Sequence, residues 1–318
     1  MIGTGNVTEK KSAPSFNKID GSLLEVVANR TPEKAKDYAA RHGTRWHQMS
    51  RDVIHDPEVD IVYIATAPGS HMEYALECIR AGKPVYIEKP MARTYAECRI
   101  INEAARENGV PVYVAYYRRG LEYFRQAGEI IQSGKLGKIL NINLQQYFPI
   151  RQEDRNPNRL PWRVIPEDSG GGYFHDMGCH ALDILFHLFG DPGAVQGSCS
   201  NLGGFYEPED TISASIRLPG DLLLTASWSF ITPPAFAKDL VEVIGEKGLL
   251  KFSIFSFQPM TLLTDGNKET ITTIQPAHIQ MPLIESIVGE MNGRGSCPST
   301  GETAAVTSRV MDEITGRS

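Results

Sequence analysis

Residues 85–90 read Val-Tyr-Ile-Glu-Lys-Pro, a short apolar run that ends in a carboxylate, an ammonium group and a proline. The apolar part predicts a buried strand, and Pro90 disfavours the helical backbone region for Lys89. The triplet Glu88-Lys89-Pro90 therefore stands at the carboxyl end of that strand. Ligands of open parallel sheets bind at this edge, which makes Lys89 a candidate site residue. Charges at a strand end are also common as a plain solvated edge, so the flanking segments decide between the two interpretations.

The segments around this strand alternate between strand and helix patterns. Three further apolar runs predict strands, namely residues 23–28, 59–66 and 110–117. Three helix starts are indicated between them by Thr31 with Pro32, by a capping box of Ser70 and Glu73, and by a second box of Thr94 and Glu97. Repeated β-α units of this length predict an α/β, doubly wound parallel sheet of the Rossmann type over residues 1–120.

From residue 121 onward the hydrophobic pattern changes from continuous runs to alternation with period two. The alternating segments are residues 139–145, 211–217, 222–230 and 241–252. Such alternation predicts strands with one covered and one open face. We expect residues 121–298 to form an α/β domain with a mostly antiparallel sheet, whose open face is a candidate surface for a homodimer or homotetramer. Ser299 and Glu302 predict the cap of a last helix, residues 299–318, which we expect to return to the first domain.

Composition excludes several classes of protein. The chain has 318 residues and a formal net charge of -6, which argues against a nucleic-acid binder. No apolar run approaches the ~20 residues that cross a bilayer, and the start shows no signal-peptide pattern. The five cysteines are scattered without a C-x-x-C, so neither a disulfide framework nor a zinc site is indicated. We expect a cytoplasmic protein.

The first residues carry a candidate phosphate loop, Ile2-Gly3-Thr4-Gly5-Asn6-Val7-Thr8. Gly3 and Gly5 fit the first two places of a G-x-G-x-x-G fingerprint, whose glycines let a pyrophosphate approach backbone N–H groups at a helix N-terminus. The third place is Thr8 instead of glycine. Pro14 is expected to interrupt the helix that follows. A lone G-x-G is often an ordinary turn, but its position before a β-α-β pattern favours cofactor binding.

The end of the second strand bears on the choice between NAD and NADP. Enzymes that use NAD usually carry an acidic residue there to hold the ribose 2′-hydroxyl. This chain has the neutral Asn29 followed by Arg30, with Lys34 one turn later. Because arginine can bind a 2′-phosphate that a carboxylate would repel, we expect NADP in preference to NAD.

A second constellation begins at the glycines Gly170-Gly171-Gly172. A helix that follows carries Asp176, His180, Asp183 and His187 on one stripe. Three interpretations compete: a polar helix face with satisfied histidines, a metal site, and acid–base chemistry in which Asp176 orients His180. The metal site is the weakest of the three because no second cluster of ligands occurs elsewhere.

Together these segments resemble the glucose–fructose oxidoreductase and inositol dehydrogenase family, also written Gfo/Idh/MocA. The resemblance runs along essentially the whole chain. It is carried by Ala65-Thr66-Ala67-Pro68 followed by His71, by residues 81–90, which read Ala-Gly-Lys-Pro-Val-Tyr-Ile-Glu-Lys-Pro, and by the three glycines with Asp176 and His180. The departures are Thr8 in place of a glycine and Asn29 in place of the usual acid.

The resemblance implies a Rossmann domain, a second domain with a large open sheet, a nicotinamide cofactor, and sugar, polyol or related substrates. Lys89 matches the family lysine that touches cofactor and substrate, and Asp176 and His180 match its carboxylate and histidine. The cofactor-binding positions expected on this basis are Gly3, Gly5, Asn6, Asn29, Arg30, Thr66, Pro68, His71, Glu88, Lys89 and Arg118. The substrate-binding positions are Lys89, Trp162, Arg163, Asp176 and His180.

The mechanism expected is hydride transfer between the nicotinamide and a carbinol or carbonyl carbon. His180, oriented by Asp176, is the acid–base group, and Lys89 holds the substrate oxygen; these two roles are exchangeable. Two other functions stay open: a non-catalytic nucleotide- or sugar-binding regulator, and a glycosidase that oxidises and re-reduces its sugar transiently. A regulator would be expected to lose the lysine or the Asp–His pair, and this chain keeps all three residues.

Overall fold

The computed structural model describes residues 1–317, which divide into two compact units. Unit 1 is Met1–Leu121 together with Pro276–Ala305, and unit 2 is Glu122–Gln275 together with the end of the chain from Val306. The expected boundary near residue 120 thus coincides with the change of unit at Leu121. The segment that rejoins unit 1 begins at Pro276 and ends at Ala305, whereas the sequence analysis assigned residues 299–318 to that part.

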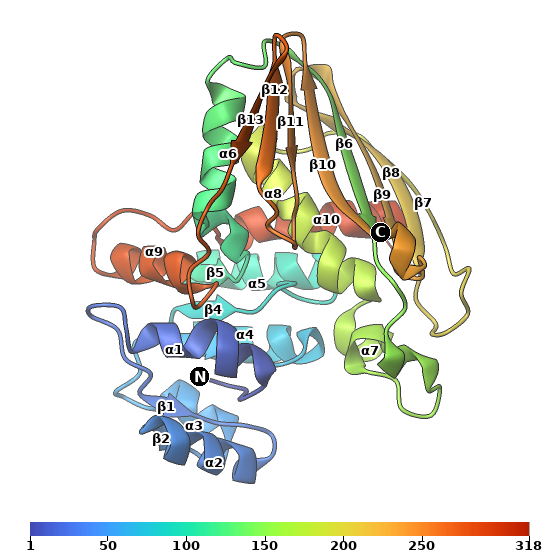
Figure 1. Ribbon diagram of the computed structural model, residues 1–318. Helices are drawn as coiled ribbons and strands as arrows, with labels where there is room; N and C mark the ends of the chain where they lie inside the picture. The colour runs from blue at the N-terminus through green and yellow to red at the C-terminus, as the bar shows by residue number, and fades with distance from the viewer. Residues whose placement is uncertain (318) are drawn as a thin grey trace. The chain divides into compact units, whose positions relative to one another are not determined.

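Unit 1 contains a parallel sheet of short strands (Figure 1). All of its strands are buried except β2, which is exposed. The strands are β1 (Val26–Val27), β2 (Arg45–Trp46), β3 (Val62–Ile64), β4 (Val85–Ile87) and β5 (Val112–Val114). Ile2 forms parallel bridges to Ala28 and Ile64 and so joins the pair β1–β2 to the trio β3–β4–β5. The resulting order, β2-β1-Ile2-β3-β4-β5, is the 3-2-1-4-5-6 order of a Rossmann domain.

Helices alternate with these strands, as the sequence predicts. They are α1 (Ala13–Phe16), α2 (Pro32–His42), α3 (Ser50–His55), α4 (His71–Arg80) and α5 (Tyr95–Asn108), followed by α9 (Met281–Met291) and the first turn of α10 (Gly301–Thr315). Glycines in the left-handed region, Gly43 and Gly109, end α2 and α5. Helix α9 packs against α1, so the returning segment lies beside the start of the chain.

The expected helix starts are only partly confirmed. Thr94 accepts a hydrogen bond from the Glu97 amide and caps α5. The capping box at Ser70 is wrong, because the Ser70 hydroxyl binds Thr66 and the Ala67 carbonyl instead. The box at Ser299 and Glu302 is also wrong: the reciprocal pair is Thr300 and Thr303, one residue further along. In each case the serine hydroxyl donates its hydrogen bond to a backbone carbonyl or a hydroxyl group outside the helix that it was expected to cap.

Pro14 does not interrupt the helix that follows the glycine turn. A π-helix over Thr8–Ser12 runs directly into α1, and Pro14 takes an early position of α1. In the wider turn the Ala13 amide reaches back to the Thr8 carbonyl. A proline lacks only its own N–H group, and it is tolerated where that donor would be unsatisfied anyway.

Unit 2 is built on an eight-stranded sheet with the order β13-β12-β11-β10-β6-β9-β8-β7. The strands are β6 (Ile139–Tyr147), β7 (Val195–Ser200), β8 (Thr211–Leu218), β9 (Leu222–Ser229), β10 (Lys238–Gly245), β11 (Gly248–Phe252), β12 (Met260–Thr264) and β13 (Asn267–Ile271). Only the neighbours β6 and β9 run parallel, and every other pair is antiparallel, which confirms the mostly antiparallel sheet. Strands β7, β12 and β13 were not expected.

Helices α6 (Glu122–Gln132) and α8 (Cys179–Phe189) lie along one face of this sheet (Figure 1). The strand residues on that face are buried, such as Ile212, Ala214 and Ile216 of β8. The opposite face is polar and open. It bounds a shallow depression of about 660 Å³ lined mainly by serine, threonine, asparagine and glutamine side chains of β6 to β9. The alternation in the sequence therefore has the predicted meaning.

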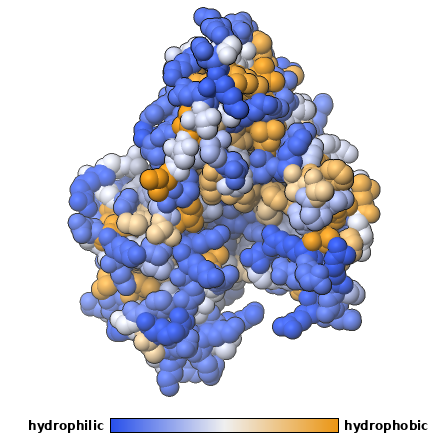
Figure 2. All heavy atoms as spheres, viewed as in Figure 1, coloured by the Kyte–Doolittle hydropathy of each residue, from blue (hydrophilic) through white to orange (hydrophobic). Residues whose placement is uncertain are grey.

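The face of the molecule shown in Figure 2 is mostly hydrophilic, and hydrophobic residues appear on it in separate areas. Among residues 1–317, no helix is long and apolar enough to cross a membrane. All five cysteines are free thiols, and only Cys199 is not buried.

Candidate functional site

The first part of the site in unit 1 is the turn Gly3-Thr4-Gly5, which leaves the central strand position at Ile2. Gly3 has φ +99°, and a Cβ there would lie 2.6 Å from the Ala65 carbonyl oxygen, so only glycine fits. Gly5 and Asn6 are exposed, and nothing lies within 4 Å of a Cβ placed on Gly5. The side chain of Thr8 is buried, and its hydroxyl donates to the Gly5 carbonyl at 2.7 Å. Thr8 thus braces the turn at the place where the fingerprint has its third glycine.

The end of β1 faces this turn. The side-chain nitrogen of Asn29, Nδ2, donates to the Thr4 hydroxyl at 2.8 Å. Its side-chain oxygen, Oδ1, accepts a hydrogen bond from the backbone N–H of Thr31 at 2.9 Å. Arg30 and Lys34 are exposed beside it. No carboxylate occupies the position of Asn29, and the residue that follows it is the cation Arg30.

The segment after β3 is tied to the segment after β4 by His71. This imidazole is fully buried, with Nε2 3.1 Å from the Thr66 carbonyl and Nδ1 3.0 Å from the Pro90 carbonyl. Burial lowers the pKa of His71, so the ring is neutral at pH 7. Pro68 is buried as well, while Thr66 is half-buried. A neutral ring carries one N–H, so His71 donates to one of these two carbonyls, while both of its ring nitrogens face backbone.

Lys89 and Arg118 complete the carboxyl edge of the sheet. Lys89 follows β4 with its side chain half-buried, and the Lys89–Pro90 peptide bond is cis. The Arg118 side chain, in the short helix Tyr117–Gly120 after β5, is buried and has its guanidinium 4.9 Å from the centre of the Tyr117 ring. Glu88 is buried and accepts the Lys89 amide at 3.2 Å.

This edge fits a dinucleotide. The turn at Gly3 and Gly5 leaves room for phosphates, the helix that follows presents its N-terminus to them, and cations stand at Arg30 and Arg118. Every expected cofactor-binding residue lies on the carboxyl edge of the parallel sheet. His71 and Glu88 differ from the rest because their polar atoms bind the protein itself.

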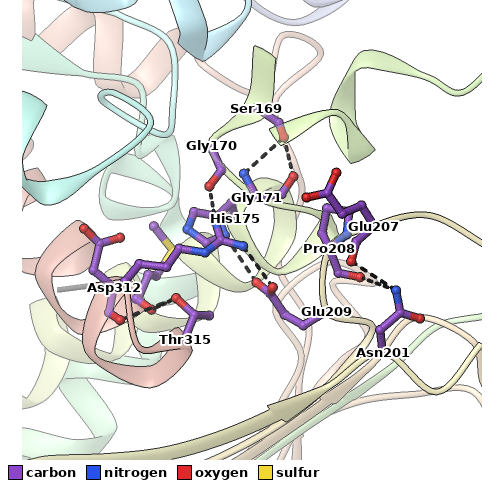
Figure 3. A network of polar contacts seen from close by, with 12 residues as sticks. Ser169, Gly170, Gly171, His175, Asn201, Glu207, Pro208, Glu209, Asp312 and Thr315 are labelled. Carbon is purple, nitrogen blue, oxygen red and sulfur yellow. Dashed lines mark hydrogen bonds and ion pairs between the residues drawn. The ribbon is translucent and has the colours of Figure 1, made fainter. Parts of the chain in front are cut away.

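In unit 2 each of the three glycines is required by the protein's own structure; Figure 3 shows Gly170 and Gly171 near His175. Gly170 has φ +81°, and Cβ atoms on Gly171 and Gly172 would meet His175 Nδ1 at 2.1 Å and Pro208 Cβ at 2.8 Å. The groups that approach the glycine backbone closely are thus the side chains of His175 and Pro208. Burial, reinforced by Arg317, lowers the pKa of His175 to about 3 and keeps this ring neutral.

The same loop is held by the end of the chain. Arg317 donates to the Gly170 carbonyl and to Glu209 Oε2, the latter at 2.9 Å, while Glu209 Oε1 lies 3.8 Å from His175 Nδ1 (Figure 3). Ser169 closes the loop by binding Gly171 through its hydroxyl. These contacts fix the backbone immediately before Asp176.

Asp176 is paired with one of the expected substrate residues. Arg163 Nε donates to Asp176 Oδ2 at 3.0 Å, and the Arg163 guanidinium lies 4.7 Å from the ring centre of Trp162. Trp162 and Arg163 occupy the short helix Trp162–Val164 and are half-buried. The structure therefore brings Trp162, Arg163 and Asp176 together.

His180 lies in the first turn of α8. Its side chain is 5% exposed, and its ring centre is 5.7 Å from that of Phe255. Asp176 belongs to a π-helix, Phe174–Gly178, that precedes α8, so the regular stripe expected from Asp176 to His187 does not exist. Asp183 is buried with Thr307 Oγ1 3.5 Å away, whereas His187 is exposed. Within residues 1–317, no group of His, Cys, Asp or Glu side chains is arranged to hold a metal ion.

A cavity of about 170 Å³ lies beside this segment in unit 2. Half of its lining residues are aromatic, and one is a cation. The lining residues are Phe148, Pro149, Arg151, Tyr173, Met177 and Phe230. Phe255 packs edge-on against Phe148 as well as against His180, so one ring connects the cavity wall to the histidine. Tyr147, the last residue of β6, lies on the open face of the sheet, where its hydroxyl is 2.8 Å from Ser227 Oγ.

Several residues that contact the candidate site residues of unit 1 or of unit 2 were not predicted from the sequence. Tyr63, Gln280, Phe255 and Arg317 each contact a site residue or the loop next to one, over separations of up to 192 residues. No local motif marks them. Buried tyrosines in a predicted strand, such as Tyr63 and Tyr86, are the one usable signal, because a buried hydroxyl needs a polar partner.

Comparisons with known proteins agree with this architecture. Residues 1–116 match the family model described as the oxidoreductase family with an NAD-binding Rossmann fold, and residues 124–251 match the GFO/IDH/MocA C-terminal domain. "Oxidoreductase P35" of Formosa agariphila is 35% identical over 99% of this chain and 97% of its own length. A 1,5-anhydro-D-fructose reductase of Ensifer adhaerens is 26% identical over 95% and 90% of the two chains.

A solved structure of levoglucosan dehydrogenase in complex with NADH has the same fold, with a TM-score of 0.88 over 99% of this chain and 95% of that chain at 20% identity. The chain is thus an oxidoreductase with an NAD(P)-binding Rossmann domain. It belongs to the Gfo/Idh/MocA family.

Proposed function

We propose that this protein transfers a hydride between NAD(P) and a carbinol or carbonyl carbon of a sugar, a polyol or a related small molecule, with Lys89, Asp176 and His180 as its catalytic residues. The observation that carries the proposal is the position of Lys89, which follows β4 on the same sheet edge as the Gly3 turn and Arg118. Relatives named as sugar and polyol oxidoreductases support the substrate class.

The nicotinamide, when bound, accepts or donates the hydride. The protein must then move one proton and stabilise charge on the reacting oxygen. His180 is proposed to move the proton, and Lys89 to donate a hydrogen bond to the oxygen as charge develops on it. Asp176, with Arg163 holding Oδ2, presents a carboxylate in a fixed direction. Trp162 and the aromatic cavity beside Met177 offer flat apolar surfaces of the kind that pack against a hydroxylated ring.

Cofactor titration followed by a substrate screen tests the proposal. NADPH and NADH are titrated by fluorescence, and sugars and polyols are then screened with NADP⁺ and NAD⁺ for a change of nicotinamide absorbance. Tight cofactor binding with turnover supports the proposal. Binding without any turnover of a broad panel favours a nucleotide-binding regulator, and cleavage of glycosides without net change of the cofactor favours a glycosidase.

For the cofactor we propose NADP in preference to NAD. Asn29, Arg30 and Lys34 leave the end of β1 without a carboxylate and with two cations. Asn29→Asp introduces a charge that repels a 2′-phosphate and can accept the 2′-hydroxyl of NAD. The variant is expected to lower the ratio of kcat/KM with NADP to that with NAD by at least ~10-fold, since one charged contact contributes ~1.4 kcal/mol or more. A wild-type-like ratio would contradict the role assigned to this position; Lys36→Asp on α2 is the control for charge alone.

The polar face of the sheet in unit 2 is proposed to form a homodimer or homotetramer. It is broad, its exposed side chains are small, and β6 to β9 leave it uncovered within one chain. Ser215→Arg, in the middle of this face, is expected to dissociate the oligomer in light-scattering measurements. A wild-type mass of 35.2 kDa would contradict the assembly. We also infer that the protein works in the cytoplasm, where its free thiols persist.

A further inference from the structure

The returning segment of unit 1 makes a direct polar contact with the Glu-Lys-Pro motif. Gln280, immediately before α9, is 1% exposed and lies between Tyr86 of β4 and Glu88, which follows that strand. Its Nε2 donates to Glu88 Oε1 at 2.7 Å, and its Oε1 accepts from the Tyr86 hydroxyl at 2.8 Å. Both ends of the side-chain amide are therefore used, the nitrogen as a donor and the oxygen as an acceptor.

Glu88 is held from three sides. Besides Gln280, the Tyr63 hydroxyl bonds Oε1 at 2.6 Å, and the Lys89 amide bonds Oε2 at 3.2 Å. Burial, and then the charge of Glu88, raise the pKa of both Tyr63 and Tyr86 well above the ordinary tyrosine value, so their hydroxyls keep their protons. The carboxylate is thus fixed in one orientation and binds the backbone of the residue that follows it.

The same contacts reach the helix behind the phosphate loop. The Gln280 amide donates to the Lys11 carbonyl at 3.2 Å, and the Tyr63 hydroxyl lies 2.9 Å from Ser12 Oγ. A closed ring of polar contacts therefore runs from Lys11 and Ser12 through Gln280, Glu88 and Tyr63. Because every member is buried or bonded to backbone, a shift of any one of them leaves a desolvated polar group unpaired.

We propose that Gln280 is a positioning residue that fixes Lys89 through Glu88 and couples the position of Lys89 to the helix after the Gly3 turn. The proposal rests on the proposed function of Lys89. Gln280 does not touch the cofactor or the substrate in this scheme. It determines the position of Lys89. A displacement of a reacting group by about 1 Å can lower the rate on the order of 10²-fold.

Two substitutions at Gln280 test this role. Gln280→Leu removes both hydrogen bonds at similar size, and Gln280→Glu places a second carboxylate against Glu88. Both are expected to lower kcat by roughly ten- to a hundred-fold, with the cofactor Kd within about three-fold of wild type. Asn102→Leu is the matched control, because Asn102 is a buried amide of the same unit that binds only the Gly301 carbonyl among the hydrogen bonds described. It is expected to lower the melting temperature and leave kcat unchanged.

A second measurement does not depend on turnover. Lysine labelled with ¹³C at Cε gives one NMR signal per residue, and Lys89 is assigned by the signal that Lys89→Arg removes. Both Gln280 variants are expected to move the Lys89 signal, and Asn102→Leu is expected to leave it in place. An unmoved Lys89 signal in both Gln280 variants overturns the positioning role, as does a loss of kcat in Asn102→Leu equal to theirs. A moved signal in a protein that turns over no sugar or polyol keeps the positioning role and removes the proposed function.

Discussion

Lys89→Ala is expected to lower kcat by ~10²–10⁴-fold, which is the usual contribution of a group that transfers a proton or stabilises an oxyanion. The lysine follows β4 on the edge where ligands of this fold bind, and Glu88 fixes its backbone. Its side chain is half-buried, and the buried core of β4 is provided by Val85, Tyr86 and Ile87. The variant should therefore fold and bind NAD(P)H with a Kd within about ten-fold of wild type.

Lys83 provides a control at the other end of the same strand. Its Nζ donates to the backbone carbonyls of Asp56 and Val59, so it is a structural lysine at the amino edge of the sheet. Lys83→Ala is expected to reduce stability by ~1–3 kcal/mol, because two carbonyls lose a charged donor, and to leave kcat unchanged. Steady-state kinetics and urea unfolding of the two variants check the contrast. Wild-type turnover in Lys89→Ala would remove this residue from the mechanism.

The architecture follows from patterns that the sequence displays locally. Buried β-branched runs, left-handed glycines at helix ends and period-two alternation predict a Rossmann unit followed by a mostly antiparallel sheet, and both are present. Three strands were not predicted, namely β7, β12 and β13. The two at the edges, β7 (Val-Gln-Gly-Ser-Cys-Ser) and β13 (Asn-Lys-Glu-Thr-Ile), consist mostly of polar and exposed residues. Edge strands carry little hydrophobic signal because only part of one face is covered.

Details that depend on competing acceptors could not be predicted. Ser70 and Ser299 match the capping pattern, yet the hydroxyl of Ser299 donates to the Val114 carbonyl, which lies 185 residues away in the chain. His71 has the neighbours of a cofactor ligand in the sequence, but in the fold its nitrogens face two carbonyls. A sequence lists the donors, whereas the choice among acceptors is made by tertiary structure.

The polar ring around Glu88 shows the same limit at the site itself. The motif identifies Glu88 and Lys89, but it contains no information on the partner of the carboxylate. That partner, Gln280, comes from the segment that rejoins unit 1, and its glutamine has no local pattern. The candidate residues of the site could therefore be named from the sequence, and the groups that hold them could not.

His180 in unit 2 is the other residue whose loss should be severe. His180→Gln is expected to lower kcat by ~10²–10⁴-fold, because it keeps a polar side chain of similar size next to Phe255 and removes the imidazole that is proposed to move the proton. Cofactor binding, measured by NAD(P)H fluorescence, should stay near wild type since the phosphate loop belongs to unit 1. His187→Gln, two turns further along α8 and exposed, is the control and should leave kcat unchanged.

The pH dependence of kcat/KM in the two variants shows which of the two residues transfers the proton. If His180 transfers the proton, the limb of the kcat/KM profile that reports the acid–base group disappears in His180→Gln and persists, at a lower rate, in Lys89→Ala. If the limb survives in His180→Gln and disappears in Lys89→Ala, the lysine moves the proton and the histidine holds the oxygen. An unchanged rate in His180→Gln would contradict both assignments, because each of them gives His180 a direct contact with the reacting oxygen or its proton.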